Sequence, residues 1–99
     1  MTATLNFLPA AEAEAADAID WYEEQEPGLG SQFRTALEDA ILAIQENPLA
    51  FPVVYGSAVR RGLTRRFPYL VIYTLDDGAI LVIAVFHSSR NPTIWRGRV

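Results

Sequence analysis

Arginine and a single histidine, concentrated in the second half of the chain, are the residues best suited to chemistry. The sequence contains eight arginines, no lysine and one histidine, His87, and only Arg34 lies in the first half. Arginine offers a planar fork of donors that fits a carboxylate or a phosphate, whereas lysine provides a point charge. Histidine has a reference pKa of about 6.5 and can act as a general acid or base near neutral pH. These residue types predict contact with an anionic partner.

Four arginines lie close together in residues 60–67, a segment with the character of a strand. Strand alternation places Arg61 and Arg65 on one face and Arg60 and Arg66 on the other. A sheet edge with this many arginines can bind phosphates or an acidic peptide. The alternative is that the charges protect an exposed edge strand from aggregation.

A second group of candidate residues follows the last predicted strand and consists of His87, Arg90, Trp95, Arg96 and Arg98. His87 is either a general acid or base or a hydrogen-bonding residue at the end of the strand. Trp95 either stacks on a nucleic-acid base or anchors the chain to the core. The two groups together make the basic end of the chain the candidate site.

The first half of the chain predicts one strand and two helices. Residues 3–7 alternate between apolar and polar as a strand does. Apolar residues then recur at spacings of three and four through residues 10–25, which predicts a helix. A proline- and glycine-rich break at residues 27–30 separates it from a second helix, which begins at Leu29 and stops before Pro48. Two helices joined by such a short turn form an antiparallel hairpin.

The second half predicts three strands after a proline- and aromatic-rich connector at residues 48–56. The strands cover residues 60–67, 69–75 and 79–87, and an Asp-Gly turn at residues 77–78 is the strongest hairpin signal. The elements together predict an α+β fold. It consists of an N-terminal strand, an α-helical hairpin, a three-stranded antiparallel meander in one twisted sheet and a short C-terminal helical turn.

The length and charge of the chain limit its class. Ninety-nine residues predict a single domain over residues 1–99. The net charge is −4, but residues 1–50 carry ten acids and one base, and residues 51–99 carry two acids and seven bases. The halves therefore have net charges of −9 and +5. A contact with RNA or an acidic partner is then expected on one side of the molecule only.

Other classes of site are excluded or not expected. The chain has no cysteine, which excludes disulfides, thiolate zinc sites and cysteine nucleophiles. With one histidine and no carboxylate cluster, neither a metal nor another cofactor is expected. The first residues lack a basic segment followed by an apolar stretch, and the longest apolar run, residues 79–86, is too short to span a bilayer. We therefore expect a cytoplasmic protein that does not contact the membrane.

Short motifs along nearly the whole chain resemble the RelE/ParE superfamily of bacterial toxins, the toxin half of type II toxin–antitoxin modules. The match is closest to members labelled plasmid stabilisation proteins. The motifs of the first half are Trp21-Tyr22-Glu23, Pro27-Gly28-Leu29-Gly30 with Phe33, and Ile44 with Pro48 and Phe51-Pro52. Those of the second half are Arg60-Arg61, Leu63, Arg66-Phe67-Pro68-Tyr69, Val71-Ile72-Tyr73, and Ala84-Val85-Phe86-His87 with Arg90-Asn91-Pro92 and Trp95.

The resemblance implies a helical hairpin packed on a twisted, mainly antiparallel sheet. It also implies a cognate antitoxin, whose C-terminal segment would wrap around the toxin, neutralise it and form a hetero-oligomer with it. Such segments often carry acids, which would suit the arginine surface. We expect the antitoxin in an exposed apolar groove between the hairpin and the sheet.

The resemblance leaves two kinds of target. ParE-like members inhibit DNA gyrase, whereas RelE-like members cleave mRNA on the ribosome. RelE-like nucleases have a basic residue inside the third strand, and here that position is Leu70, which favours a toxin that acts by binding a target such as gyrase. The residues expected to bind the target or the antitoxin are Arg60, Arg66, Tyr73, Trp95 and Arg96.

Two alternatives remain open. The first is a ribosome-dependent endoribonuclease, in which His87 would move a proton and arginines would stabilise the phosphorane. Its expected catalytic residues are Arg61, Arg65, His87 and Arg90. The second alternative is a degenerate toxin that is retained only as the antitoxin's partner or co-repressor.

Overall fold

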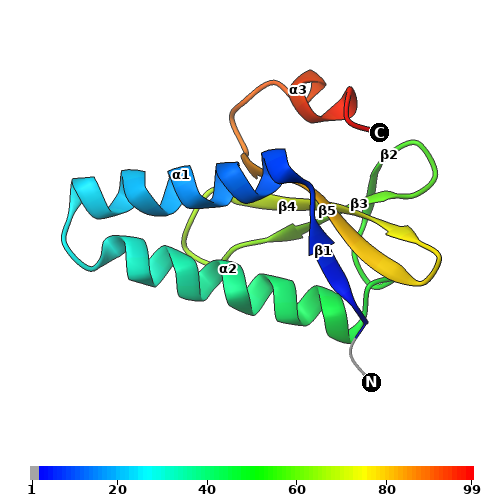
Figure 1. Cartoon of the computed structure of the whole chain (residues 1–99), viewed down its shortest axis with the longest axis horizontal. Helices are drawn as coiled ribbons and strands as arrows, with labels where there is room; N and C mark the ends of the chain where they lie inside the picture. The colour runs from blue at the N-terminus through cyan, green and yellow to red at the C-terminus, as the bar shows by residue number, and fades with distance from the viewer. Residues whose placement is uncertain (1–2) are drawn as a thin grey trace.

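A hairpin of two long helices lies across one face of a five-stranded sheet, and a short third helix lies on the other face (Figure 1). The computed structural model describes residues 3–99; residues 1 and 2, which the predicted domain includes, lie outside the described residues. The strand order is β1-β5-β4-β3-β2. The elements are β1 (Leu5–Phe7), α1 (Pro9–Gln25), α2 (Leu29–Glu46), β2 (Val53–Tyr55), β3 (Val59–Leu63), β4 (Tyr69–Asp76), β5 (Ala79–His87) and α3 (Thr93–Arg96).

The α+β class and the helical hairpin are confirmed, but the sheet is larger than predicted. Strands β3, β4 and β5 pair antiparallel, as the meander requires. Strand β1 adds to β5 in parallel, and β2 lies in the segment predicted as a connector and pairs antiparallel with β3. The sheet is therefore mixed and has five strands instead of the three of the meander.

Strand β3 ends at Leu63, four residues before the predicted end. The hydroxyl of the buried Thr64 lies 3.0 Å from the carbonyl oxygen of Phe67 and 3.2 Å from that of Tyr69, which closes a turn. Arg66 has a left-handed φ of 69° in this turn. The prediction that Arg65 and Arg66 alternate across a strand is therefore wrong, since the chain has already left the sheet.

The conformation of the turn between the two helices explains why glycines occur there. Gly28 has a φ of 90°, which favours glycine, and precedes the first residue of α2. The Glu23 carboxylate of α1 accepts hydrogen bonds from the N–H groups of Gly28 and Gly30, so one helix caps the next. A Cβ at Gly30 would lie 2.7 Å from the carbonyl oxygen of Ile19, so the helices can approach this closely only at a glycine.

The sheet buries apolar side chains on both faces. Between the sheet and the hairpin lie fully buried residues, which are Phe33, Ile44, Val71, Tyr73 and Val82. On the opposite face Ile72, Ala84 and Phe86 pack beneath Trp95 of α3. Strands β4 and β5 therefore supply both layers, which agrees with their apolar sequences. Within residues 3–99 no helix combines the length and the apolar character needed to cross a membrane.

Candidate binding site

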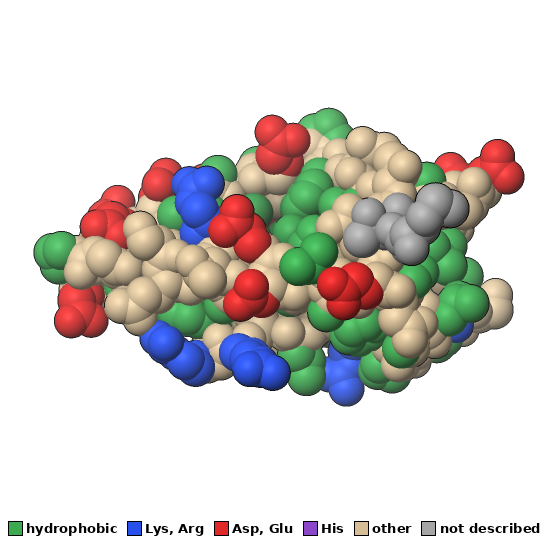
Figure 2. All heavy atoms as spheres, turned by 90° about the horizontal axis from the view of Figure 1, so that it is seen from below, with side chains coloured by type: hydrophobic (Ala, Val, Ile, Leu, Met, Phe, Trp, Pro, Cys, Tyr) green, Lys and Arg blue, Asp and Glu red, His purple; other side chains and the backbone are tan. Residues whose placement is uncertain are grey.

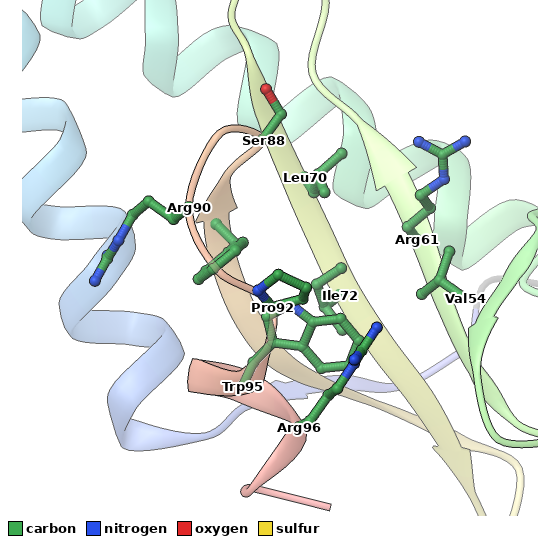
Figure 3. A pocket seen from close by; sticks show the side chains of 10 residues that line it. Val54, Arg61, Leu70, Ile72, Ser88, Arg90, Pro92, Trp95 and Arg96 are labelled. Carbon is green, nitrogen blue, oxygen red and sulfur yellow. The ribbon is translucent and has the colours of Figure 1, made fainter.

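A cavity of about 310 Å³ opens on the sheet face opposite the helical hairpin (Figure 3). Its floor is apolar and consists of Leu70 and Ile72 from β4 and Phe86 from β5. Leu70 pairs with Phe86 across the two strands, and Ile72 pairs with Arg61 of β3. Paired residues share a face of a sheet, so the strand register alone brings this floor and Arg61 together.

Three arginines line the cavity around this floor: Arg61, Arg90 and Arg96. Figure 3 shows the side chains of Arg61 and Arg90 pointing away from each other toward opposite rims, whereas Arg96 lies against Trp95. The guanidinium carbon of Arg90 is 5.5 Å from the centre of the Phe86 ring. Within residues 3–99 the one salt bridge joins Arg98 to Glu14, so the positive charge at the cavity is not neutralised by an ion pair.

Trp95 and Arg96 of α3 form one wall of the cavity. Both pack against the aromatic ring of Tyr55 from β2, which supports this wall but does not line the cavity. The Trp95 ring is 3% exposed and lies edge-to-face on Tyr55, with 5.9 Å between the ring centres. The Arg96 guanidinium lies 5.1 Å from the Tyr55 ring centre and 5.7 Å from that of Trp95. Two donors in this wall, Trp95 Nε1 and Arg96 Nε, are buried and have no hydrogen-bond partner.

An ion pair between Glu14 of α1 and Arg98 holds the C-terminal segment in place. The Arg98 guanidinium donates to both carboxylate oxygens of Glu14, at 2.9 and 3.0 Å, and to the carbonyl oxygen of Ile83, at 2.9 Å. Glu14 also accepts from the N–H of Val85, at 3.2 Å. The hydrogen bonds to Glu14 raise the pKa of Arg98, although burial opposes this.

This ion pair takes the place of a missing neighbour strand. Strand β1 ends at Phe7, and the N–H of Leu8 makes the last backbone bond to β5, at the carbonyl oxygen of Val82. The next two polar groups on that edge of β5 are satisfied by Arg98 and Glu14 instead of by a backbone. The arrangement closes the sheet edge and fixes the segment that carries Trp95.

His87 lies on the hairpin side of the sheet and does not line the cavity. Its ring centre is 5.3 Å from that of Tyr69, the residue paired with it on β4. Its Nδ1 accepts a hydrogen bond from the N–H of Ser89, at 3.1 Å, and lies 2.7 Å from the Ser89 hydroxyl oxygen. Burial raises the pKa of Tyr69, while the charge of Arg90 acts in the opposite direction.

The remaining arginines of the candidate group lie near α2. Arg60 donates to the carbonyl oxygens of Leu49 and Phe51, at 3.2 and 2.6 Å, and so fastens the segment after α2. Arg66 donates to the side chain of Gln32. Arg65 lines a hollow of about 330 Å³ between α2 and β3, together with the 59% exposed Leu63. This hollow lies at the boundary where the sequence predicted an apolar groove.

Tyr73 is fully buried, which separates it from the other expected contact residues. Its hydroxyl donates to the carbonyl oxygen of Pro48, at 2.6 Å, and burial raises its pKa. The side chain therefore holds the end of α2 against the sheet and offers no surface to a partner.

The face of the molecule over α2 also displays the segregation of charge. Figure 2 shows acidic side chains spread over this face, and most of the visible arginines gathered along one border. In the part of the chain that the structure describes, no three His, Asp or Glu residues are placed to hold a metal ion together.

Comparison with known proteins decides the family. A family model described as the ParE toxin of type II toxin-antitoxin system, parDE, matches residues 5–92. The chain belongs to the ParE toxin family. Its fold is similar to a solved structure, "Chromosomal ParDE TA system from P. aeruginosa", with a TM-score of 0.75 and 16% sequence identity over 87% of this chain and 96% of that chain. The sequence gives no significant match among curated proteins.

Membership of the ParE family confirms the predicted superfamily and the main functional prediction, a toxin of a toxin–antitoxin system. It supports the ParE-type interpretation and not the RelE-like alternative. Of the four expected catalytic residues, the structure brings Arg61 and Arg90 to one cavity and leaves Arg65 and His87 outside it. Trp95 and Arg96 join the cavity, although both lie beyond the residues that the family model matches.

Two residues of this ParE-family chain were missed by sequence reasoning. Tyr55 lies in the predicted connector, and Glu14 is one of the ten acids of residues 1–50. Nothing in the local sequence marks either residue, because their partners, Trp95 and Arg98, are 40 and 84 residues away in the chain. Contacts of this range are made only once the sheet has formed.

Proposed function

We propose that this toxin acts in the cytoplasm by binding DNA gyrase and inhibiting it, without cleaving nucleic acid. We propose further that a cognate antitoxin neutralises it in a toxin–antitoxin hetero-oligomer. The observation that carries the proposal is the separation of the candidate catalytic residues across the two faces of the sheet.

Catalysis of RNA cleavage requires a base within hydrogen-bond reach of the 2′-hydroxyl and donors beside the same phosphate. His87 faces the hairpin side of the sheet and packs on Tyr69, whereas Arg61 and Arg90 line a cavity on the opposite face. His87 and Arg61 lie on opposite faces of the sheet, so a single phosphate would not contact both of them. The position expected to be basic in a RelE-like nuclease is Leu70, which forms part of the apolar cavity floor. The arrangement supports recognition and disfavours acid–base chemistry.

The cavity face is the surface that we assign to a macromolecular partner. It combines an apolar floor with three arginines that no ion pair within residues 3–99 neutralises. Leu63, on the outward face of β3 next to Arg61, continues the apolar surface and is 59% exposed. An acidic antitoxin segment with interspersed apolar residues would match both properties, and the same face would then be free for gyrase only when the antitoxin is absent.

The test has two assays on the same protein. The chain is induced in growing bacteria, where we expect growth arrest, a DNA-damage response and unchanged mRNA 5′ ends. The purified chain is then added to a DNA supercoiling reaction with gyrase, where we expect inhibition. His87→Ala should retain both effects, since the proposal gives this side chain no chemical role. Arg61→Glu should weaken inhibition, whereas Arg34→Glu, which makes the same charge change on the exposed face of α2, should not.

Ribosome-phased mRNA cleavage with normal supercoiling would overturn the gyrase proposal in favour of the nuclease. Normal growth at high expression without the antitoxin would instead identify a degenerate toxin. Co-expression of the protein encoded by the adjoining gene should restore growth and co-purify with the chain. Failure of that gene product to bind the toxin would contradict the antitoxin assignment.

A further inference from the structure

We propose that the cavity beneath α3 is a receptor for a single carboxylate side chain, an Asp or Glu that follows or precedes an apolar residue in a polypeptide partner. The inference deepens the proposed function and rests on it for the identity of that partner as a protein. It names the chemistry of recognition and the two atoms that carry it, Trp95 Nε1 and Arg96 Nε.

Two buried donors in the wall of the cavity have no acceptor. Trp95 Nε1 and Arg96 Nε are buried and unpaired, whereas nearly all buried polar atoms of folded proteins have a partner. Leaving a buried donor unpaired destabilises the folded protein. Both atoms belong to consecutive residues of the wall, and both are donors. A ligand that brings acceptor oxygens would recover that cost.

The cavity has a positively charged lining. Arg61, Arg90 and Arg96 line it, and the residues lining it include no Asp or Glu. Glu14, the acid of the one ion pair in residues 3–99, is held by Arg98. A carboxylate that enters would therefore meet a positively charged lining and no competing anion. Charge-assisted hydrogen bonds are roughly twice as strong as neutral ones.

The apolar floor of the cavity favours a carboxylate over a phosphate. The floor of Leu70, Ile72 and Phe86 is apolar, so most of the ligand's surface inside the cavity must be apolar too. The two unpaired donors match the two oxygens of a carboxylate. A phosphate would bring a third oxygen and a second charge onto this apolar floor, where desolvation of the extra charge is costly. A volume of about 310 Å³ accommodates one acidic side chain and an apolar neighbour.

The ligand must reach donors that are buried in the unbound protein. Trp95 is fixed by packing, at 3% exposure. Arg96 is only partly buried, and its guanidinium rests on the rings of Tyr55 and Trp95. Such contacts at partly exposed sites are weaker than a charge-assisted hydrogen bond. Arg96 can therefore turn toward the incoming carboxylate.

The test is an NMR titration of the isotope-labelled protein with sodium phenylacetate, whose ring and carboxylate imitate the proposed pair. The chain has two tryptophans, so it gives two indole N–H signals. Trp95 should shift downfield and saturate, whereas Trp21, which is 54% exposed near the end of α1, should not move. Phenylacetamide, the neutral isostere, should bind at least about fivefold more weakly. Arg61→Gln should weaken phenylacetate binding, and Arg34→Gln, the matched charge change on α2, should leave it unchanged.

Equal binding of phenylacetate and phenylacetamide would overturn the carboxylate assignment, and so would equal shifts of both indole signals. Tighter binding of phenyl phosphate than of phenylacetate would show that the site prefers phosphate. Equal weakening by Arg61→Gln and Arg34→Gln would show that only net charge matters. Trp95→Phe, checked for folding by its melting temperature, should reduce the preference for the carboxylate, and an unchanged preference would show that the indole N–H does not bind it. Gyrase inhibition is measured separately, so a negative titration leaves the proposed function standing.

Discussion

Removing the Glu14–Arg98 ion pair should destabilise the protein by a measurable and strongly coupled amount. The two side chains are 18% and 20% exposed, so they lie between the surface pairs that contribute little and the buried pairs that contribute much. Arg98→Met keeps the side-chain stem but removes three hydrogen bonds, two to Glu14 and one to the carbonyl oxygen of Ile83. Glu14→Met removes the same pair and the acceptor of the Val85 N–H.

The expected loss of stability depends on the polar groups that each substitution leaves without a hydrogen-bond partner. A hydrogen bond to a charged group contributes about 1.5–3 kcal/mol, and the three bonds of Arg98 do not add independently because two share one carboxylate. We expect each single variant to lose about 2 kcal/mol. The double variant leaves neither charge without its partner. Its free energy of unfolding should therefore fall by about 2.5 kcal/mol, and not by the roughly 4 kcal/mol that the two single variants would give if they were additive. The difference is a coupling energy of about 1.5 kcal/mol. A domain of this size has a total free energy of unfolding of about 5–15 kcal/mol.

Urea unfolding followed by tryptophan fluorescence measures these changes. With a slope of about 1.5 kcal/mol per molar urea, each single variant should lower the midpoint by about 1.3 M. Glu24→Met and Arg34→Met, at exposed helical positions, are the matched controls and should stay within about 0.5 kcal/mol of the wild type. Exchange of the Val85 amide hydrogen should accelerate in Glu14→Met. Additive single-variant effects, with no coupling, would refute the idea that the pair replaces a strand at the edge of β5.

Two further predictions concern the helical hairpin and the tyrosines. Gly30→Ala should destabilise the protein by about 1–3 kcal/mol, although alanine is the better helix former by about 1 kcal/mol, because the added Cβ would lie 2.7 Å from the Ile19 carbonyl oxygen. Gly97→Ala, with nothing within 4 Å of the added atom, is the control, and a Gly30→Ala protein as stable as the wild type in urea would contradict the argument. Burial raises the pKa of Tyr22, Tyr69 and Tyr73 above 10.0, so the unfolded chain loses these protons first. Stability should therefore be intact below about pH 10 and fall as the pH rises beyond it, with a smaller fall in Tyr73→Phe. Absorbance titration at alkaline pH that matches free tyrosine would be inconsistent with this.

The helices and the central strands could be predicted because each carries its own signal. Apolar residues recur at helical spacing from Leu29 onward, and an Asp-Gly turn marks the β4–β5 hairpin. Strands β1 and β2 have three residues each, too few for an alternating pattern to specify pairing or direction. The early end of β3 depends on the hydroxyl of Thr64, whose acceptors become available only in the folded turn.

The site could be predicted only as a set of residue types. The sequence identified Arg61, Arg90 and Arg96, and strand alternation would have separated His87 from Arg61 had the register of β3, β4 and β5 been known. A bulge between Ile72 and Tyr73 shifts that register, and no residue type marks its position. Tyr73 illustrates the same limit, because its aromatic type suits both a contact surface and the core in which it is buried.

Because the acids and the arginines lie on different parts of the molecule, the rate at which it binds an acidic partner should depend on the salt concentration. The molecule measures 39 × 32 × 21 Å, whereas electrostatic screening acts over about 10 Å at 0.1 M salt and about 30 Å at 0.01 M. At 0.1 M an acidic peptide at the cavity therefore responds to the nearby arginines and little to the acids of the hairpin. At 0.01 M it also responds to the net charge of −4, which repels it. The association rate of an acidic, apolar peptide should thus pass through a maximum near 0.1 M salt, as stopped-flow fluorescence can measure. A rate that falls steadily from 0.01 M upward would mean that the acids of the hairpin lie too far from the arginine face to be felt at any salt concentration.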